Sequence, residues 1–217
     1  MPRKLSPEDL QNKDEFELLT EVSHQQLKEF VAEQITKEKF IIRVYSVYQI
    51  LMIMLFIYLG TRSIVLLIKG HALQISGIGL AVLFSFTALI VLHELLHALA
   101  YWVTGARRIS FGLELKKFIF YALADRQVIA PRAFHFVALA PFVVVKLVCL
   151  VGFFSSHNIV LTYFFLSVMC LHSLFCAGDI AMLAFYNLYP DREIYNYDNR
   201  TEGKTYFYIR KQEQNIH

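Results

Sequence analysis

Charged residues are scarce in this sequence, at 18% of its 217 residues, whereas an average soluble domain has about 25%. Apolar residues make up 56%, and they are concentrated in long runs that contain few charges. The net charge of +3 is too small to indicate a nucleic-acid partner. The composition therefore argues against an ordinary soluble domain. It predicts an integral membrane protein with one membrane domain, whose partner is the lipid bilayer.

Cysteine is also scarce. The three cysteines, Cys149, Cys170 and Cys176, all lie within apolar segments, which argues against a secreted disulfide framework. A secretory signal pattern is lacking too, because the first 40 residues are charged rather than apolar. We therefore expect the first membrane span itself to direct insertion.

The apolar runs divide the chain into three expected regions. We expect residues 1–40 to form a cytoplasmic amphipathic helical segment, residues 41–190 a membrane-embedded domain, and residues 191–217 a cytoplasmic tail. In the first region, Ser6 and Ser23 each stand three residues before an acid or an amide, which is typical of a helix start. The resulting helix would pack on the membrane domain, lie at the lipid headgroups or bind a partner.

Four apolar segments are near the ~20 residues that a helix needs to cross a membrane. They cover residues 41–61, 75–104, 133–154 and 159–189, and the first could continue through "SIVLLI" as a tilted or broken helix. The sequence thus predicts an all-α polytopic membrane protein with about four transmembrane helices, an N-terminal amphipathic helix and a short β-hairpin-like connection.

Positive charges in the connections predict the orientation. Lys and Arg number seven in residues 1–43, then two, six and none in the successive connections and five in the tail. Positive residues are enriched on the cytoplasmic side, so this alternation places both termini in the cytoplasm. We expect the plasma membrane of a bacterium as the location.

Two charged residues lie outside any motif, and we expect no special function for either. Lys146, in the third apolar segment, is expected to snorkel toward the headgroups. Asp198 lies in the tail, which is expected to be extended or to form a hairpin, and we expect it to be a solvated charge.

The most informative motif lies in the second apolar segment. His93-Glu94-Leu95-Leu96-His97 has the pattern H-E-x-x-H, and residues four apart share one helix face, so both imidazoles can reach one Zn²⁺ ion. Glu94 is placed to hold the attacking water and to take its proton. Placing an ionisable group in hydrocarbon costs roughly 2.5–3.5 kcal/mol, so such groups usually face a cavity or a partner. Their position in an apolar segment therefore strengthens the prediction of a metal site. The alternative is a pair of core histidines that bond to Glu94 without a metal.

A catalytic zinc site needs a third protein ligand, and the fourth apolar segment supplies candidates. His172, Cys176 and Asp179 are spaced by four and three residues and form one helical stripe. At about 1.5 Å rise per residue, Asp179 is offset from the depth of His97 by roughly 5 Å, and His172 lies about 10 Å further out. We therefore expect Asp179 as the metal ligand, His172 as a neighbouring group or alternative ligand, and Cys176 as a packing residue.

Several stretches of the chain resemble one family. "HELLHALAYWVTGA", "ALAPF" and "CAGDI" are similar to the zincin peptidases related to the site-2 proteases, which are multi-span intramembrane metalloproteases. The resemblance covers residues 85–190, with a weaker likeness in the tail. It implies that His93 and His97 are zinc ligands, Glu94 the general base and Asp179 the third ligand. The Asn-Pro-Asp-Gly type motif of the best-studied site-2 proteases is missing, because no proline precedes Asp179.

The connection between the second and third segments has a strand pattern. In "RISFGLEL", apolar residues alternate with polar residues and glycine, and "KFIFYALADRQVI" could return as the partner strand. The resemblance implies that a hairpin in this region lies near the site, where strand addition would present an extended substrate segment. A surface hairpin at the headgroups is the alternative.

Together these features predict a zinc-dependent intramembrane metalloprotease that hydrolyses a peptide bond of a membrane protein near the cytoplasmic face. In this hypothesis, Glu94 deprotonates the attacking water and later protonates the leaving amine. Two other hypotheses stay open: a catalytically silent membrane scaffold or regulator, and a metal-dependent hydrolase of a small amphiphile. The strand-like connection favours a peptide substrate.

Overall fold

A computed structural model describes residues 5–114 and 119–211. The chain forms two compact units, each built from segments that are separate in the sequence. Unit 1 consists of Met1–Lys39, His97–Ala138 and Ala181–His217, and unit 2 of Phe40–Leu96 and Leu139–Ile180.

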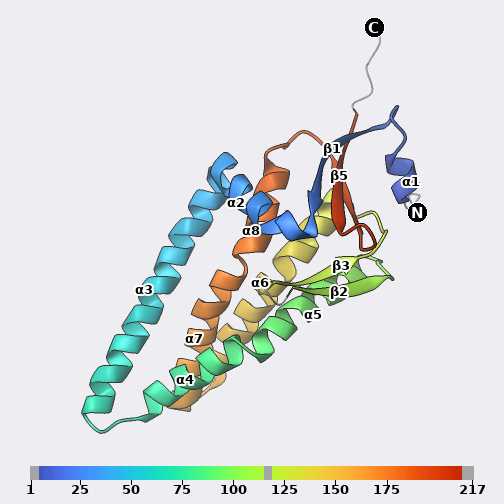
Figure 1. The fold of residues 1–217 in the computed structure, drawn as a ribbon. Helices are drawn as coiled ribbons and strands as arrows, with labels where there is room; N and C mark the ends of the chain where they lie inside the picture. Colours follow the sequence, from blue (N-terminus) through green and yellow to red (C-terminus); the bar gives the residue numbers. More distant parts are fainter. Residues whose placement is uncertain (1–4, 115–118, 212–217) are drawn as a thin grey trace. The chain divides into compact units, whose positions relative to one another are not determined.

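Unit 2 is helical throughout its regular structure. It contains α3 (Phe40–Ile68), α4 (Leu73–Ser85) and α7 (Ile159–Phe175), with parts of α5 (Ala88–Val103), α6 (Pro131–Ser155) and α8 (Ala177–Asn187). Helix α7 packs against both α3 and α4 (Figure 1). The first predicted apolar segment continues as one helix through "SIVLLI" to Ile68.

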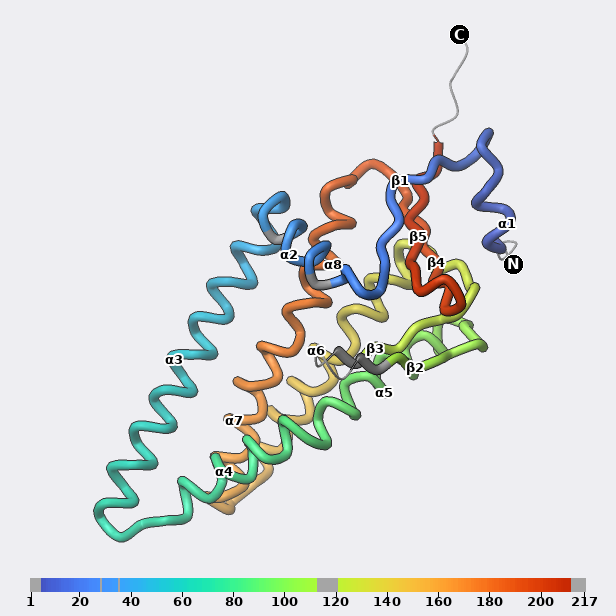
Figure 2. Tube along the Cα trace, in the orientation of Figure 1, coloured from blue at the N-terminus to red at the C-terminus, as the bar shows by residue number. Residues whose placement is uncertain are grey.

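Two helices of the described chain, α3 and α6, are each long and apolar enough to cross a membrane. The pairs α4 with α5 and α7 with α8 meet the same criterion as bent helices, with bends of 50° and 46°. Figure 2 follows the chain through both breaks. The described residues therefore contain two to four candidate spans, which is consistent with a membrane protein.

The break between α4 and α5 has a local cause. The hydroxyl of Thr87 donates to the carbonyl of Leu83 at 2.6 Å. Such a bond competes with the backbone N–H for the same carbonyl and often bends a helix. No proline or glycine stands at Phe86 and Thr87 or at Cys176, where the second break occurs. A residue typical of a helix break is therefore missing at the break positions themselves, which is why each segment reads as one straight helix.

Small residues allow the helices of unit 2 to approach closely. Gly77 on α4 faces α7, and a Cβ at this position would lie only 2.4 Å from the carbonyl oxygen of Val160. Ala81 and Ser85 on α4 and Ser167 on α7 have no exposed surface. Close contact between small residues is a common basis of helix association in lipid, where the surrounding solvent is as apolar as the side chains.

Lys146 does not behave as the snorkelling residue that the sequence predicts. Its ammonium group donates a hydrogen bond to the carbonyl of Met169 on α7. The same group lies over the rings of Tyr48 and Phe142, at 5.4 Å and 5.6 Å from their centroids. The positive charge is therefore stabilised by a carbonyl and two aromatic faces within unit 2.

Unit 1 combines short helices with two small antiparallel sheets. Its elements are α1 (Pro7–Leu10), β1 (Phe16–Ser23), a 3-10 helix (His24–Gln26), α2 (Leu27–Lys37), β2 (Ile109–Glu114), β3 (Ile119–Ala124), β4 (Ile194–Asn199) and β5 (Lys204–Arg210). One sheet has the strand order β1-β5-β4, and the other is the hairpin β2-β3 (Figure 2).

The all-α prediction is wrong for the N-terminal region, although most of the chain is helical. Residues 16–23 form β1, which pairs with β5 so that Phe16 stands opposite Arg210. Both predicted helix starts are confirmed, since Ser6 and Asp9 form a capping box and Ser23 caps the 3-10 helix. The tail forms the hairpin β4-β5. β1 escaped prediction because its partner strand lies at the other end of the chain.

The predicted hairpin between the second and third apolar segments is confirmed. β2 and β3 pair antiparallel, with Ile109 opposite Ala124. The reversal after α5 uses Gly105, whose φ of 95° lies in the left-handed region that favours glycine. The N–H of Ala106 donates to the carbonyl of Tyr101 at 2.9 Å, as in a Schellman-type helix end.

An aromatic core joins the helical and β parts of unit 1. The rings of Phe134 and Tyr186 stack with centroids 4.2 Å apart, and the Tyr186 hydroxyl donates to Oδ1 of Asn196 at 2.8 Å. Asp198 is buried rather than solvated, contrary to the prediction from the sequence. Its Oδ1 accepts a hydrogen bond from the hydroxyl of Thr205 at 2.6 Å, which compensates the lost hydration.

Candidate metal centre

Helix α5 carries the H-E-x-x-H motif in the way that the sequence predicts. His93 and His97 are one turn apart, and both side chains are buried. One nitrogen of each ring lies within 4.8 Å of the other, so the two imidazoles face a common point. The helix therefore presents two nitrogen ligands at a separation that one metal ion could bridge.

The ring of His97 is held by a backbone group. Its Nδ1 lies 3.0 Å from the carbonyl oxygen of Val137 on α6, and this carbonyl can only accept a hydrogen bond. Such a partner selects the tautomer that has its proton on Nδ1 and leaves the lone pair on Nε2. Histidines that bind metals commonly donate their second ring N–H to a carbonyl in this manner.

Asp179 lies in the first turn of α8, immediately after the break that follows α7. Its Oδ2 is 3.3 Å from Nε2 of His93. Two ligand atoms bound tetrahedrally to one zinc ion, each at about 2.0–2.1 Å, are separated by about 3.3 Å. The carboxylate and the imidazole therefore have the spacing that a shared zinc ion would require, and their nitrogen and oxygen donors suit zinc.

His172 and Cys176 lie on the opposite side of the His93 ring. Nε2 of His172 is 3.1 Å from Nδ1 of His93, and Sγ of Cys176 is 3.6 Å from Nδ1 of His172. Both residues have no exposed surface. The sequence predicted His172 as a neighbour of the site and Cys176 as a packing residue only. The four-residue spacing of His172 and Cys176 was the signal for a second ligand pair.

Glu94 follows His93 on α5 and is partly buried. A helix turns by about 100° per residue, so the Glu94 side chain lies beside the face that carries the two histidines. Its part as general base stays a prediction, because it depends on the position of a substrate.

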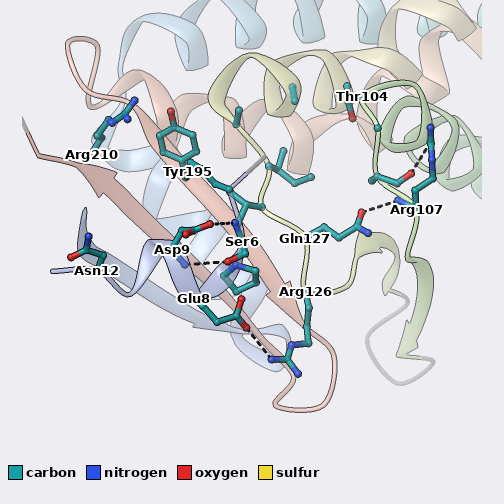
Figure 3. A pocket seen from close by; sticks show the side chains of 18 of the residues that line it. Ser6, Glu8, Asp9, Asn12, Thr104, Arg107, Arg126, Gln127, Tyr195 and Arg210 are labelled. Carbon is teal, nitrogen blue, oxygen red and sulfur yellow. Dashed lines mark hydrogen bonds and ion pairs between the residues drawn. The ribbon is translucent and has the colours of Figure 1, made fainter. Parts of the chain in front are cut away.

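A large cavity lies elsewhere, in unit 1. It has a volume of about 1070 Å³ and is lined by α1, by the turn that follows α5 and by the segment that follows β3 (Figure 3). Glu8 lies 3.6 Å from Arg126, and Gln127 accepts a hydrogen bond from the backbone N–H of Arg107 at 2.8 Å. Hydrogen bonds from its own N–H and from the Ser6 hydroxyl lower the pKa of Glu8. These polar groups bond to one another, and none of the candidate metal ligands lines this cavity.

Comparison with known proteins supports the metal chemistry. Residues 86–192 match the sequence model of a family described as "Putative zincin peptidase". No curated protein and no solved structure matches the chain. The matched segment runs from just after α4 to beyond α8 and includes every candidate ligand. Over this segment the chain is similar to zincin-type metallopeptidases, for which zinc is the expected cofactor.

Proposed function

We propose that the protein is a zinc-dependent intramembrane metalloprotease related to the site-2 proteases, which hydrolyses a peptide bond of a membrane protein near the cytoplasmic face. One observation carries the proposal: Nε2 of His93 on α5 and Oδ2 of Asp179 on α8 are 3.3 Å apart. The spacing is that of two ligands of one zinc ion, and the residues come from two different apolar segments.

His93, His97 and Asp179 would hold the zinc. The Val137 carbonyl at Nδ1 of His97 leaves Nε2 as the ligand atom, and Asp179 likewise faces Nε2 of His93. Both imidazoles would therefore bind through the same type of nitrogen. When bound, zinc acts as a Lewis acid that polarises the scissile carbonyl and stabilises negative charge on its oxygen. Asp179 is preferred to His172 as third ligand, because His172 faces Nδ1 of His93 instead.

Glu94 would perform the proton transfers. Its carboxylate accepts a proton from the attacking water and then donates this proton to the nitrogen of the leaving amine. The burial of His93 and His97 limits the access of bulk water to their rings. In such surroundings each electrostatic interaction is stronger than it would be in water.

The bilayer would surround the apolar helices. α3 and α6 expose many large apolar side chains, such as Ile57 and Val151, at 61% and 64%. Lipid rather than water is the solvent in which this exposure is favourable. The distribution of Lys and Arg supports an orientation with both termini in the cytoplasm. A bacterial plasma membrane is the location that we propose.

The hairpin β2-β3 would receive the substrate. Among the described strands, β2 pairs with β3 alone, so its other edge offers unpaired backbone groups. An extended peptide could add to this edge by backbone hydrogen bonds. This role accounts for a peptide substrate, whereas a hairpin that lies at the headgroups would not select one.

The test compares the protein with its Glu94→Gln variant in cells. New protein N-termini in membrane fractions are identified by N-terminal labelling and mass spectrometry. We expect a set of membrane-protein cleavages that disappears in Glu94→Gln, while the zinc content stays the same. Glu17→Gln, which changes an exposed residue of β1, is the matched control and should keep the cleavages. Identical N-termini in all three samples would favour a catalytically silent scaffold.

A further inference from the structure

The candidate ligands come as two pairs with the same spacing. His93 and His97 are four residues apart on α5, and His172 and Cys176 are four residues apart at the end of α7. Each pair therefore presents two metal-binding atoms on one helix face. The proposed function uses the first pair with Asp179 and leaves the second pair without a role.

Unit 2 brings the second pair onto the His93 ring. Each of His93, His172 and Cys176 offers one ligand atom, and these atoms all lie within 4.8 Å of one another. The three residues are buried, with exposed fractions of 6% for His93 and 0% for His172 and Cys176. A site with three buried ligands is closed to solvent, as structural zinc sites are.

The separations fit a tetrahedral ion. Nδ1 of His93 and Nε2 of His172 are 3.1 Å apart, against about 3.3 Å for two nitrogens bound to zinc. Nε2 of His172 and Sγ of Cys176 are 3.8 Å apart, against about 3.5 Å for a nitrogen and a sulfur on the same ion. A shift of a few tenths of an ångström would bring these two pairs to the separations on zinc, and the ligand atoms of His93 and Cys176 lie within 4.8 Å of each other.

We propose that His93, His172 and Cys176 form a second metal-binding set, which takes a thiophilic divalent cation such as Zn²⁺ or Cd²⁺. The first set consists of His93, His97 and Asp179, the zinc ligands of the proposed function. Two imidazoles and one thiolate make the second set softer than the imidazoles and carboxylate of the first set. The set therefore selects for cations that bind sulfur, whereas cations that prefer oxygen ligands are excluded.

The two sets share one residue. His93 faces Asp179 through Nε2 and His172 through Nδ1. A neutral imidazole offers one lone pair, so His93 serves one set at a time. If the proposed function holds, a cation in the second set removes a ligand from the catalytic zinc and inhibits hydrolysis. The second set itself does not depend on that function.

Cobalt binding to the full-length protein in detergent tests the second set directly. Co²⁺ alone is titrated into the metal-free protein, and the near-ultraviolet charge-transfer band from thiolate to cobalt is recorded. We expect this band in the His97→Ala/Asp179→Ala variant, which lacks two ligands of the first set. It should disappear when Cys176→Ser or His172→Asn is added. Cys170→Ser, a buried cysteine on the same helix, is the matched control and should keep the band.

The outcomes separate this proposal from the proposed function. Absence of the band in His97→Ala/Asp179→Ala, in protein that stays folded by circular dichroism, would overturn the second set and leave the protease proposal intact. A band that persists after Cys176→Ser would overturn it as well. A band that depends on Cys176, in a protein that cleaves nothing, would support the second set and count against the protease.

Inhibition provides an independent readout. If both proposals hold, excess Cd²⁺ inhibits cleavage by the wild-type protein, and Cys176→Ser raises the concentration needed by roughly 10- to 100-fold, a range typical of changes around metal ligands. Cys170→Ser should leave the inhibition unchanged. Equal inhibition of wild type and Cys176→Ser would contradict the competition for His93.

Discussion

The hydroxyl of Tyr45 on α3 donates a hydrogen bond to the carbonyl of Ser173, within the last turn of α7. Gln49, one turn further along α3, donates to the same carbonyl from Nε2 at 2.9 Å. Carbonyls in the last turn of a helix lack partners within the helix, and a buried one needs a partner from elsewhere. The two side chains thus stabilise the chain at the break between α7 and α8, which directly precedes the turn that carries Asp179.

Removal of both donors should destabilise this break. In Tyr45→Phe/Gln49→Leu, the Ser173 carbonyl loses both side-chain donors inside the protein, which costs about 1–3 kcal/mol of unfolding free energy. Tyr45→Phe alone should cost less, because Gln49 still donates to the same oxygen. Thermal unfolding in one fixed detergent, followed by circular dichroism, measures the differences.

Tyr58→Phe is the control for this measurement. Tyr58 lies on the same helix, is 54% exposed, and accepts a hydrogen bond from Arg62. Its change should stay within about 0.5 kcal/mol of wild type. A double variant as stable as Tyr58→Phe would show that the bonds to Ser173 do not support the break.

Gly77→Ala should separate α4 from α7. The added Cβ would lie 2.4 Å from the Val160 carbonyl oxygen, and this backbone atom cannot move independently of its helix. Overpacking of this kind costs about 1–3 kcal/mol. Gly79→Ala on the same helix is the matched control, since its Cβ would meet no described atom within 4 Å. Equal melting temperatures of the two variants would contradict the packing described for α4 and α7.

Tyr186→Phe should destabilise unit 1. The substitution keeps the ring that stacks on Phe134 but removes the donor to Oδ1 of Asn196, which is 3% exposed. A buried acceptor that loses its hydrogen bond costs about 1–3 kcal/mol. Tyr189→Phe removes a hydroxyl from a partly buried ring nearby and should have little effect. Denaturant unfolding of the purified variants distinguishes the two, and an equal loss in both would argue against a specific role of the Asn196 bond.

The candidate site was predictable because its signals are local. The four-residue spacings of His93 with His97 and of His172 with Cys176 follow from helix periodicity alone. The predicted single stripe that also included Asp179 is wrong, because the helix bends by 46° at Cys176 and Asp179 lies on α8. Ionisable residues are rare within apolar segments, so these residues were easily recognised as candidates. The hairpin β2-β3 was equally visible, because its alternating residues and its partner strand are adjacent in the sequence.

Features that depend on distant partners were not predictable. β1 pairs with β5, nearly the whole chain away, and its own residues alternate too weakly to indicate a strand. Asp198 is a common surface residue by type, and its burial depends on Thr205 in the neighbouring strand. The part of Cys176 in the proposed second set depends on the position of His93, which no pattern within α7 reveals.

The zinc content of purified protein tests the central claim most directly. Cys176→Ser is the reference, because it removes the second ligand set and leaves His93, His97 and Asp179 in place. We predict about one zinc per chain in Cys176→Ser and in Cys176→Ser/Glu94→Gln, and a large loss of zinc in Cys176→Ser/Asp179→Ala. Unchanged zinc in the Asp179 variant would contradict a site in which this carboxylate and the imidazole of His93 bind one ion.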